Sequence, residues 1–382
     1  MSQLDLEALS IAGAAGLDGD PHDFQVAAER CLSEGDETTA LVALDRAYGL
    51  APDDPTIAAM RATLLDRFAV EEHGLSWRYV PAGTFLMGST AGDPDERPVH
   101  PVRLDGYWIA ELPMTWSAFA QLAGWTPPPN SHPEDPGEHG FYLSQANKIR
   151  LQYCESETRQ ARDWHAHFDS EQARKMFGAV PRERPDRPFA YDRKPMVAVG
   201  WPDAEALARR LSNEQIEYAL PSEAEWEKAA RGGLIGKRYP WGDQAPSPSR
   251  CDFDHFGDFR IADPQSFPAN GYGVFGMAGG VWEWTSTVYD ALAYGGAKTP
   301  AVDPTVLERT RRDPPPEDQP QQRVLRGGSW ADAAAAVTVS FRGAAIGAGW
   351  QHGWSDSFNP NVGFRLVRRL RGQPRGWSGP SP

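Results

Sequence analysis

The chain is poor in cysteine and in basic charge, and each shortage excludes a class of protein. Only three of its 382 residues are cysteine: Cys31, Cys154 and Cys251. Their odd number and wide spacing form no CxxC pair and no disulfide framework, which favours a reducing compartment. The formal net charge is −14. The chain therefore lacks the basic composition that phosphate contact requires, and we expect no nucleic-acid partner.

Long apolar runs and targeting signals are also missing. No stretch of about 18 consecutive apolar residues occurs, so the sequence predicts no membrane span. Residues 1–7 lack the basic start and apolar core of a signal peptide. We therefore expect a cytoplasmic protein.

Tryptophan, proline and glycine are abundant, with 14, 34 and 37 residues. This mixture is typical of a loop-rich fold in which aromatic side chains hold irregular backbone in place. Near the C-terminus the sequence turns basic, and we interpret this run as a solvated strand end and tail. Its members are Arg365, Arg368, Arg369, Arg371 and Arg375.

Residues 1–75 form a helical N-terminal segment by their apolar spacing. Three helices are predicted within 22–72, separated by a turn at 35–36 and a proline-containing break at 52–55. The pattern resembles one tetratricopeptide-type unit. Such repeats need about three copies for stability, so a single unit must dock on the main domain or on a second copy of the chain.

Residues 76–382 read as a separate domain of short strands and turns. The sequence predicts a hairpin over 77–88, a strand over 100–109, and helices over 115–122, 201–211 and 222–231. The helix at 222–231 carries three glutamates, which we interpret as helix-start residues and not as catalytic groups. Two polar insertions are predicted, at 125–195, with a helix near 142–176, and at 296–322.

Seven motifs in this domain occur in an order that identifies a family resemblance. Together they resemble the formylglycine-generating enzyme (sulfatase-modifying factor) family across about 76–370. This resemblance implies an α+β class and a C-type-lectin-like fold with little regular secondary structure. The motifs are Gly83–Gly88, Leu220–Gly233, Tyr239–Asp243, Asn270–Met277, Val281–Thr285, Arg326–Trp330 and Gly363–Arg365.

The chemistry of the resembling oxidase is not matched. That enzyme uses two cysteines shortly after the Gly-Gly-Ser-Trp turn to bind copper and activate oxygen, because soft Cu(I) requires thiolates. The matching positions here are Asp332 and Val337, and no cysteine lies between 252 and 382. We therefore expect no copper, no cysteine oxidation and no enzyme of this type.

A second branch of the fold leaves an alternative open. This branch is similar to the iron-dependent sulfoxide synthases of thiohistidine biosynthesis, which use three histidines. The nearest histidines here are His165 and His167. Two residues apart on a helix, they would point to different faces, so we interpret them as surface histidines and expect no iron. A metal-dependent oxidoreductase of either type is the alternative function.

Calcium is the metal that the resemblance does imply, as a structural ion held by loop carbonyls and carboxylates. Gly276 stands where the family pattern has an asparagine ligand. A carboxylate hydrogen-bonded to loop amides is an equal interpretation of Glu283. The predicted ligands are Asp252, Phe253, Asp258, Gly279, Val281 and Glu283.

The interval 331–362, between the last two motifs, lacks cysteine, lysine, glutamate and methionine. Small residues predict a flat, accessible floor, and aromatic side chains on loops are efficient binding contacts. The layout resembles the variable proteins of diversity-generating retroelements, in which asparagine codons in this stretch are rewritten. Gln351, Trp350 and Trp354 are not products of such rewriting and would be unmutated template positions.

We therefore predict a non-catalytic display protein that binds a protein or small-molecule ligand through 331–362. A structural or regulatory relative, with the helical segment docking a partner, is a further alternative. The predicted contact residues are Asp332, Ala334, Val337, Phe341, Ile346, Trp350, His352, Trp354, Asp356, Phe358 and Asn359.

Overall fold

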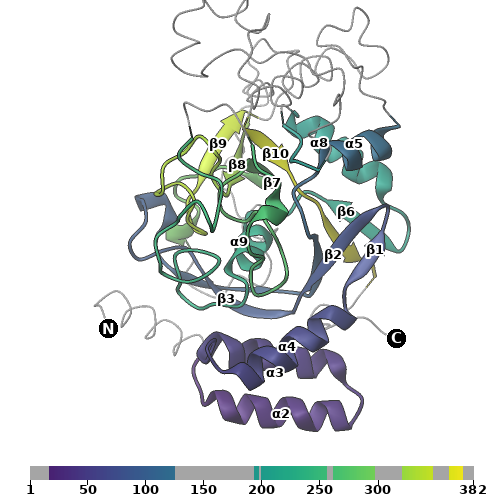
Figure 1. Cartoon of the computed structure of the whole chain (residues 1–382), viewed down its shortest axis with the longest axis vertical. Helices are drawn as coiled ribbons and strands as arrows, with labels where there is room; N and C mark the ends of the chain where they lie inside the picture. Colours follow the sequence, from purple (N-terminus) through teal and green to yellow (C-terminus); the bar gives the residue numbers. More distant parts are fainter. Residues whose placement is uncertain are drawn as a thin grey trace, which may run out of the picture.

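The computed structural model describes residues 17–124, 193–197, 199–255, 261–296, 321–346 and 361–372. In these ranges three N-terminal helices pack at one end of a domain built from three sheets (Figure 1). The predicted α+β class is confirmed. The predicted insertions 125–195 and 296–322 fall almost entirely outside the described residues. The predicted helix near 142–176, with its two histidines, falls outside them completely.

The N-terminal helices are α2 (Pro21–Ser33), α3 (Glu37–Leu50) and α4 (Pro55–Arg67), as the apolar spacing predicted. Each is preceded by an aspartate whose side chain accepts a hydrogen bond from a backbone N–H of the first turn: Asp20, Asp36 and Asp54. Such caps satisfy amide groups that have no partner within the helix. None of the helices in the described ranges is both long and apolar enough to cross a membrane.

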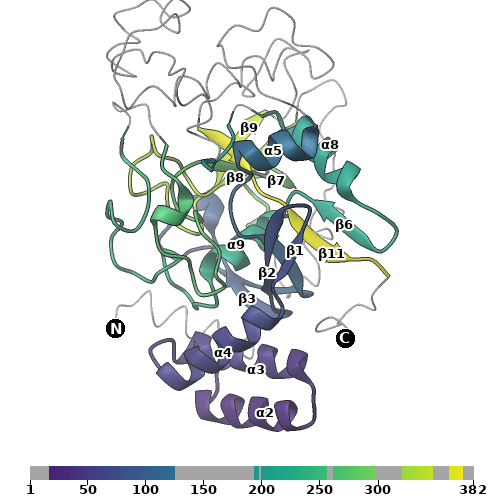
Figure 2. The ribbon, with the colours of Figure 1, turned by 45° about the vertical axis from the view of Figure 1, so that its right-hand side comes forward.

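A five-stranded antiparallel sheet forms one layer of the domain, in the order β1-β2-β5-β11-β6. Its strands are β1 (Val70–Glu72), β2 (Leu75–Val80), β5 (Tyr107–Ala110), β6 (Ile216–Ala219) and β11 (Val367–Leu370). The C-terminal strand β11 lies between β5 and β6, with Val367 opposite both Ile109 and Ala219. The two ends of the domain sequence therefore meet in one sheet (Figure 2).

A four-stranded sheet carries the motifs near the C-terminus, in the order β10-β7-β8-β9. Its strands are β7 (Trp282–Val288), β8 (Gln322–Arg326), β9 (Gly343–Ile346) and β10 (Val362–Phe364). Strand β10 runs parallel to β7, and the other pairs are antiparallel. Strands β3 (Gly83–Met87) and β4 (His100–Leu104) form a separate pair.

The remaining helices join these sheets. They are α5 (Trp116–Ala123), α8 (Trp201–Leu211), α9 (Glu223–Arg231), and the short 3₁₀ helices η1 (Pro94–Glu96), η4 (Pro264–Ser266) and η5 (Tyr294–Gly296). Helix α9 contacts β3, β7 and β8, so it lies between the two smaller sheets. It begins with a capping box, in which Ser222 and Glu225 exchange hydrogen bonds.

Two strand predictions need correction. The predicted hairpin over 77–88 does not form, because β2 pairs with β1 and β5 whereas β3 pairs with β4. The predicted strand over 100–109 is two strands, β4 and β5, that belong to different sheets. In both cases the apolar alternation continues across a corner, so periodicity alone did not reveal the change of sheet.

Three members of the basic run near the C-terminus are not part of the solvated strand end and tail that we predicted, whereas Arg371 is exposed and Arg375 falls outside the described residues. Arg365 is completely buried against Glu283, and Arg368 pairs with Glu72. Arg369 bonds to Glu225 on α9 with N–O distances of 2.7 and 2.6 Å. These pairs tie the last strand to the rest of the domain.

The helical segment docks on the domain of its own chain through Arg61 of α4. The Arg61 guanidinium is buried, and it donates to the carbonyl oxygens of Gly271 at 2.6 Å and Gly232 at 3.1 Å. It also pairs with Asp45 of α3 at 2.6 Å. Tyr272 donates to the other Asp45 oxygen at 3.0 Å. Of the two predicted docking modes, the structure therefore shows docking on the main domain.

Replacing Arg61 tests this attachment. Arg61→Met leaves the Asp45 carboxylate and two carbonyl groups without their buried partner, so we expect the free energy of unfolding to fall by about 3–5 kcal/mol. Arg67 and Glu37 form a solvent-exposed pair on the same helices. The control Arg67→Met should cost less than about 1 kcal/mol. Urea unfolding of both variants measures the difference, and equal losses would contradict the role of Arg61.

Candidate functional site

The turn after β8 sets the geometry of the interval that we predicted to bind a ligand. Gly327 and Gly328 both have positive φ, at +99° and +68°. A Cβ at Gly328 would lie 2.7 Å from the Ala336 carbonyl oxygen and 2.8 Å from a methyl group of Val337. Only glycine fits this position, because both the backbone conformation and the space exclude a side chain. The chain therefore folds tightly back on itself over 328–337.

Asp332 belongs to a polar cluster inside this turn. The hydroxyl group of Ser329 donates to the Asp332 carboxylate, and the Asn361 amide donates to Ser329 Oγ at 3.0 Å. The Asp332 carbonyl accepts from the backbone N–H of Asp254 at 2.9 Å. Asn361 precedes β10, so the two motifs that bracket the interval meet at Ser329. Asp332 itself is half-buried at the rim of this cluster.

Val337, the second position of the expected cysteine pair, is not part of any open surface. It is 0% exposed and packs with Tyr239, Cys251 and Ala278. The prediction that Val337 contacts a ligand is therefore wrong, because its side chain belongs to a small apolar core. The three residues that follow it, up to Ser340, are buried as well.

Cys251 lies in the same apolar cluster, but it does not supply a replacement thiolate. Burial, together with the adjacent Asp252 carboxylate, raises the pKa of the Cys251 thiol to about 12. A thiol of this kind stays protonated at neutral pH and is a poor metal ligand. Cys31 lies in the N-terminal helices, and Cys154 falls outside the described residues. The cluster around Val337 therefore carries no thiolate pair.

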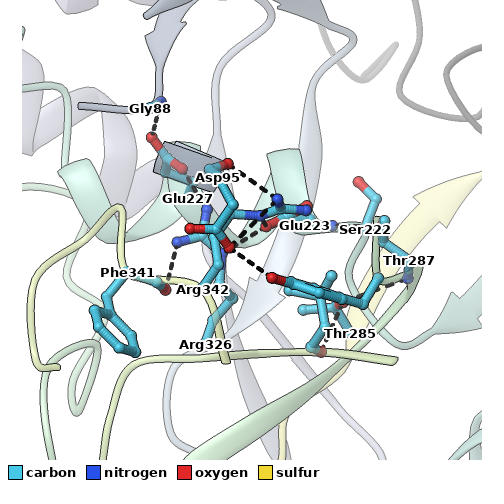
Figure 3. A network of polar contacts seen from close by, with 12 residues as sticks. Gly88, Asp95, Ser222, Glu223, Glu227, Thr285, Thr287, Arg326, Phe341 and Arg342 are labelled. Carbon is cyan, nitrogen blue, oxygen red and sulfur yellow. Dashed lines mark hydrogen bonds and ion pairs between the residues drawn. The ribbon is translucent and has the colours of Figure 1, made fainter. Parts of the chain in front are cut away.

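A buried ion network lies under the turn and links it to α9 (Figure 3). Arg326, the last residue of β8, pairs with Glu227 and lies 3.3 Å from Glu223. It also donates to the carbonyl oxygens of Val339 at 3.0 Å and Phe341 at 2.9 Å. One guanidinium group therefore holds β8, α9 and the far side of the turn together.

Arg342 extends the network toward the surface. Its guanidinium donates to both oxygens of Glu223, at 2.7 and 3.1 Å, and to the carbonyl oxygens of Asp95 and Asp290. Asp95 lies in η1, and Asp290 lies in the loop after β7. Arg342 directly precedes β9, so the exit from the turn is fixed as firmly as its entry.

The glutamates of α9 are structural, but the helix dipole is only part of the reason. Burial alone would raise the pKa of Glu227, but the guanidinium groups of Arg231 and Arg326 outweigh burial and hold this pKa below its usual value. Burial would likewise raise the pKa of Glu225, but the guanidinium group of Arg369 holds it below its usual value. Each glutamate of α9 is thus an anchor for an arginine from elsewhere in the sequence. This agrees with our non-catalytic interpretation.

Glu283 serves as an ion-pair partner in the structure. Both of its carboxylate oxygens bond to Arg365, at 2.7 and 2.8 Å, and the indole N–H of Trp226 donates to one of them at 2.6 Å. The buried Arg365 guanidinium thus balances the charge of Glu283 in this structure. The role of Glu283 as a calcium ligand stays a prediction.

The second predicted calcium position is similarly engaged. The Asp252 carboxylate accepts from the Ala262 N–H at 2.8 Å and lies 2.8 Å from His255 Nε2. Within the described ranges no group of three or more His, Cys, Asp or Glu side chains is placed to hold a metal ion. Phe253, Gly279 and Val281 lie in the surrounding loops, and Asp258 falls outside the described residues. Calcium binding stays a prediction.

The accessible part of the interval is its rim. Ala333, Ala335 and Ala344 are exposed, whereas Ala334, Phe341 and Ile346 are half-buried. The predicted contacts Trp350, His352, Trp354, Asp356, Phe358 and Asn359 lie outside the described residues. For the described part, the predicted open floor is therefore a narrow rim over a buried core.

Two contacts in this region were not predicted from the sequence. His255 approaches through its backbone N–H, which donates to the Trp330 carbonyl at 2.7 Å. The ring of Trp282 packs against that of Phe341, with centroids 5.9 Å apart. Trp282 belongs to a motif that we identified in the sequence. Its contact with Phe341 depends on the register of β7, β8 and β9, which a single sequence does not determine.

Comparison with known proteins agrees with this architecture. The model of the sulfatase-modifying factor enzyme 1-like domain matches residues 68–370. A formylglycine-generating enzyme of Streptomyces coelicolor is 33% identical over 273 residues, covering 66% of this chain and 77% of the relative. The inactive C-alpha-formylglycine-generating enzyme 2 of Bos taurus is 27% identical over 329 residues, covering 78% and 89%.

A solved structure, Treponema denticola variable protein 1, shares the fold. It superposes with a TM-score of 0.50 at 18% sequence identity, covering 77% of this chain and 94% of that one. This confirms the expected C-type-lectin-like fold of the formylglycine-generating type.

Neutralising the centre of the ion network should destabilise the protein strongly. Glu227→Gln removes the carboxylate that both buried guanidinium groups, those of Arg231 and Arg326, are bonded to. We expect a loss of about 3–5 kcal/mol in unfolding free energy. The Glu205 carboxylate forms an exposed pair with Arg209 on α8. The control Glu205→Gln should change stability by less than about 0.5 kcal/mol in the same urea titration. A small effect of Glu227→Gln would contradict the proposed anchoring.

The same network predicts a sensitivity to acid. Because the folded-state pKa of Glu227 is lowered, its contribution to stability is fully present above the unfolded pKa, about 4.3. It is lost as pH falls through the lower folded pKa. The stability of the wild-type chain should therefore decline below about pH 4.3, and Glu227→Gln should show a shallower decline. Parallel acid limbs for the two proteins would contradict this assignment.

Proposed function

The chain belongs to the sulfatase-modifying factor family, and we propose that it uses the family scaffold to bind a ligand without catalysing an oxidation. One observation carries the proposal: the two positions that match the oxidase's cysteines hold Asp332 and Val337. Neither can act as a soft thiolate ligand for Cu(I). Both are instead integrated in the fold, one in a polar turn and the other in an apolar cluster.

The local surroundings support the loss of the original chemistry. The single thiol near Val337, that of Cys251, is buried and has a raised pKa. The Glu227 and Glu223 carboxylates beneath the turn belong to ion pairs with Arg326 and Arg342. A group that is held by a buried ion pair is poorly suited to exchange protons or to ligate a metal during turnover. The ion pairs beneath the turn thus form a rigid support for it.

Such a support suits a binding surface at 331–362, with the described rim residues around Asp332 as its first contacts. Exposed alanines on a firmly anchored turn accept other side chains at small cost in stability. The partially exposed Phe341 adds an aromatic contact of the kind that contributes strongly to binding. The ligand would be a protein or a small molecule, as the fold of variable proteins permits. More specifically, we propose that the codons of this segment are rewritten, as in the variable proteins of diversity-generating retroelements.

The DNA next to the gene tests whether this segment is rewritten. We expect a near-duplicate of the DNA for residues 331–365 beside a reverse transcriptase gene. Its differences from the coding copy should fall on adenines, in codons of rim residues such as Ala333, Ala335 and Ala344. The codons of the buried Val337 and Arg342 should be unchanged, because substitutions there disrupt the core or the ion network. Sequencing of the neighbouring DNA decides, and the absence of such a duplicate contradicts diversification.

A further inference from the structure

A cavity lies between the N-terminal helices and the domain, apart from the turn around Asp332. Its volume is about 420 Å³, within the usual range for small-molecule sites. Helices α2 and α3 form one wall, and β3, the end of α9 and the loop after α9 form the other. The described residues that line it include none from 321–346. Apolar side chains dominate its wall: Leu17, Phe24, Val42, Phe85, Leu86 and Ile235.

The charges on this wall are predominantly positive, although the chain as a whole carries −14. Three basic side chains, Arg46, Lys228 and Arg231, line the cavity together with one carboxylate, that of Asp45. Asp45 is already bonded to Arg61 and Tyr272, and Arg231 is paired with Glu227. The positive charge of the wall therefore comes from Arg46 and Lys228. The wall therefore complements a molecule with an apolar body and a negative charge.

Lys228 is the basic residue best placed to receive that charge. Its side chain is almost completely buried on α9, and its ammonium group donates to the carbonyl oxygens of Pro81 and Gly83. In the described part of the chain no carboxylate lies within ion-pair distance of it. An ammonium group has three N–H donors, so one is left for a ligand. Burial accordingly lowers the pKa of Lys228 to about 8.

We propose that this cavity binds a small amphipathic carboxylate, with the carboxylate group on Lys228 and the apolar body between α3 and β3. Binding would join the helical segment to the domain beside the Arg61 contacts. The cavity shares no described lining residue with the turn around Asp332. The proposal is therefore independent of the function proposed for that turn.

Octanoate serves as the probe, with 1-octanol as its neutral counterpart, in calorimetric titrations of the full chain at pH 7. We expect octanoate to bind and 1-octanol to bind at least about tenfold more weakly, because a charged hydrogen bond is lost. Lys228→Met should weaken octanoate binding to a similar degree. Ala43→Phe, which fills the cavity from α3 and leaves Lys228 in place, should abolish it. The control Lys237→Met removes a lysine outside the cavity and should leave the affinity unchanged.

The proposal is overturned if the wild-type chain does not bind octanoate, or if it binds 1-octanol equally well. Unchanged octanoate affinity in Lys228→Met would also overturn it, because the carboxylate would then be held elsewhere. Lys228→Met also removes two internal hydrogen bonds, so thermal unfolding must show that this variant is folded. If it is not, Ala43→Phe decides, and octanoate affinity equal to that of the wild type contradicts the site.

Discussion

The Glu227 carboxylate lies where three distant parts of the chain meet, and their arrangement depends on it. One of its oxygens accepts from the backbone N–H of Gly88 and from Arg231, and the other pairs with Arg326. Arg326 in turn holds the backbone of the turn at Val339 and Phe341. A charge buried at this depth is tolerated only when it is paired and fully hydrogen-bonded. The sequence of α9 and that of the C-terminal turn therefore constrain each other.

This constraint explains how the turn keeps its shape without the two cysteines of the oxidase. The interactions that shape the turn are the paired glycines, the arginine–glutamate pairs and the Ser329–Asn361 bond, and none of them requires a cysteine. Asp332 and Val337 are accommodated by local contacts of their own. The exposed side chains of the rim make none of these contacts, whereas the support beneath them depends on them. Such a separation suits a binding surface, because ligand contacts gain from a rigid base.

Much of the fold was accessible from the sequence because its signals are local. Apolar spacing and capping residues gave the helices near the N-terminus and α9, and the ordered motifs gave the domain. The corners between β2 and β3 and between β4 and β5 were missed, since alternation does not report which sheet a strand joins. The roles of Glu283 and of the C-terminal arginines were missed for a related reason. Their partners lie far away in sequence, so pairing appears only in three dimensions.

The candidate binding site stays a prediction, and the structure corrects the place of one of its residues. Residue types at 332 and 337 indicated that the oxidase chemistry is missing, but not that Val337 is buried. The central claim is that this scaffold holds no catalytic metal. Its most direct test is the metal content of the purified full chain after exposure to Cu(I) or Fe(II) and removal of unbound ions. We expect only trace copper and iron. One equivalent of either metal per chain would contradict the claim that the scaffold holds no catalytic metal.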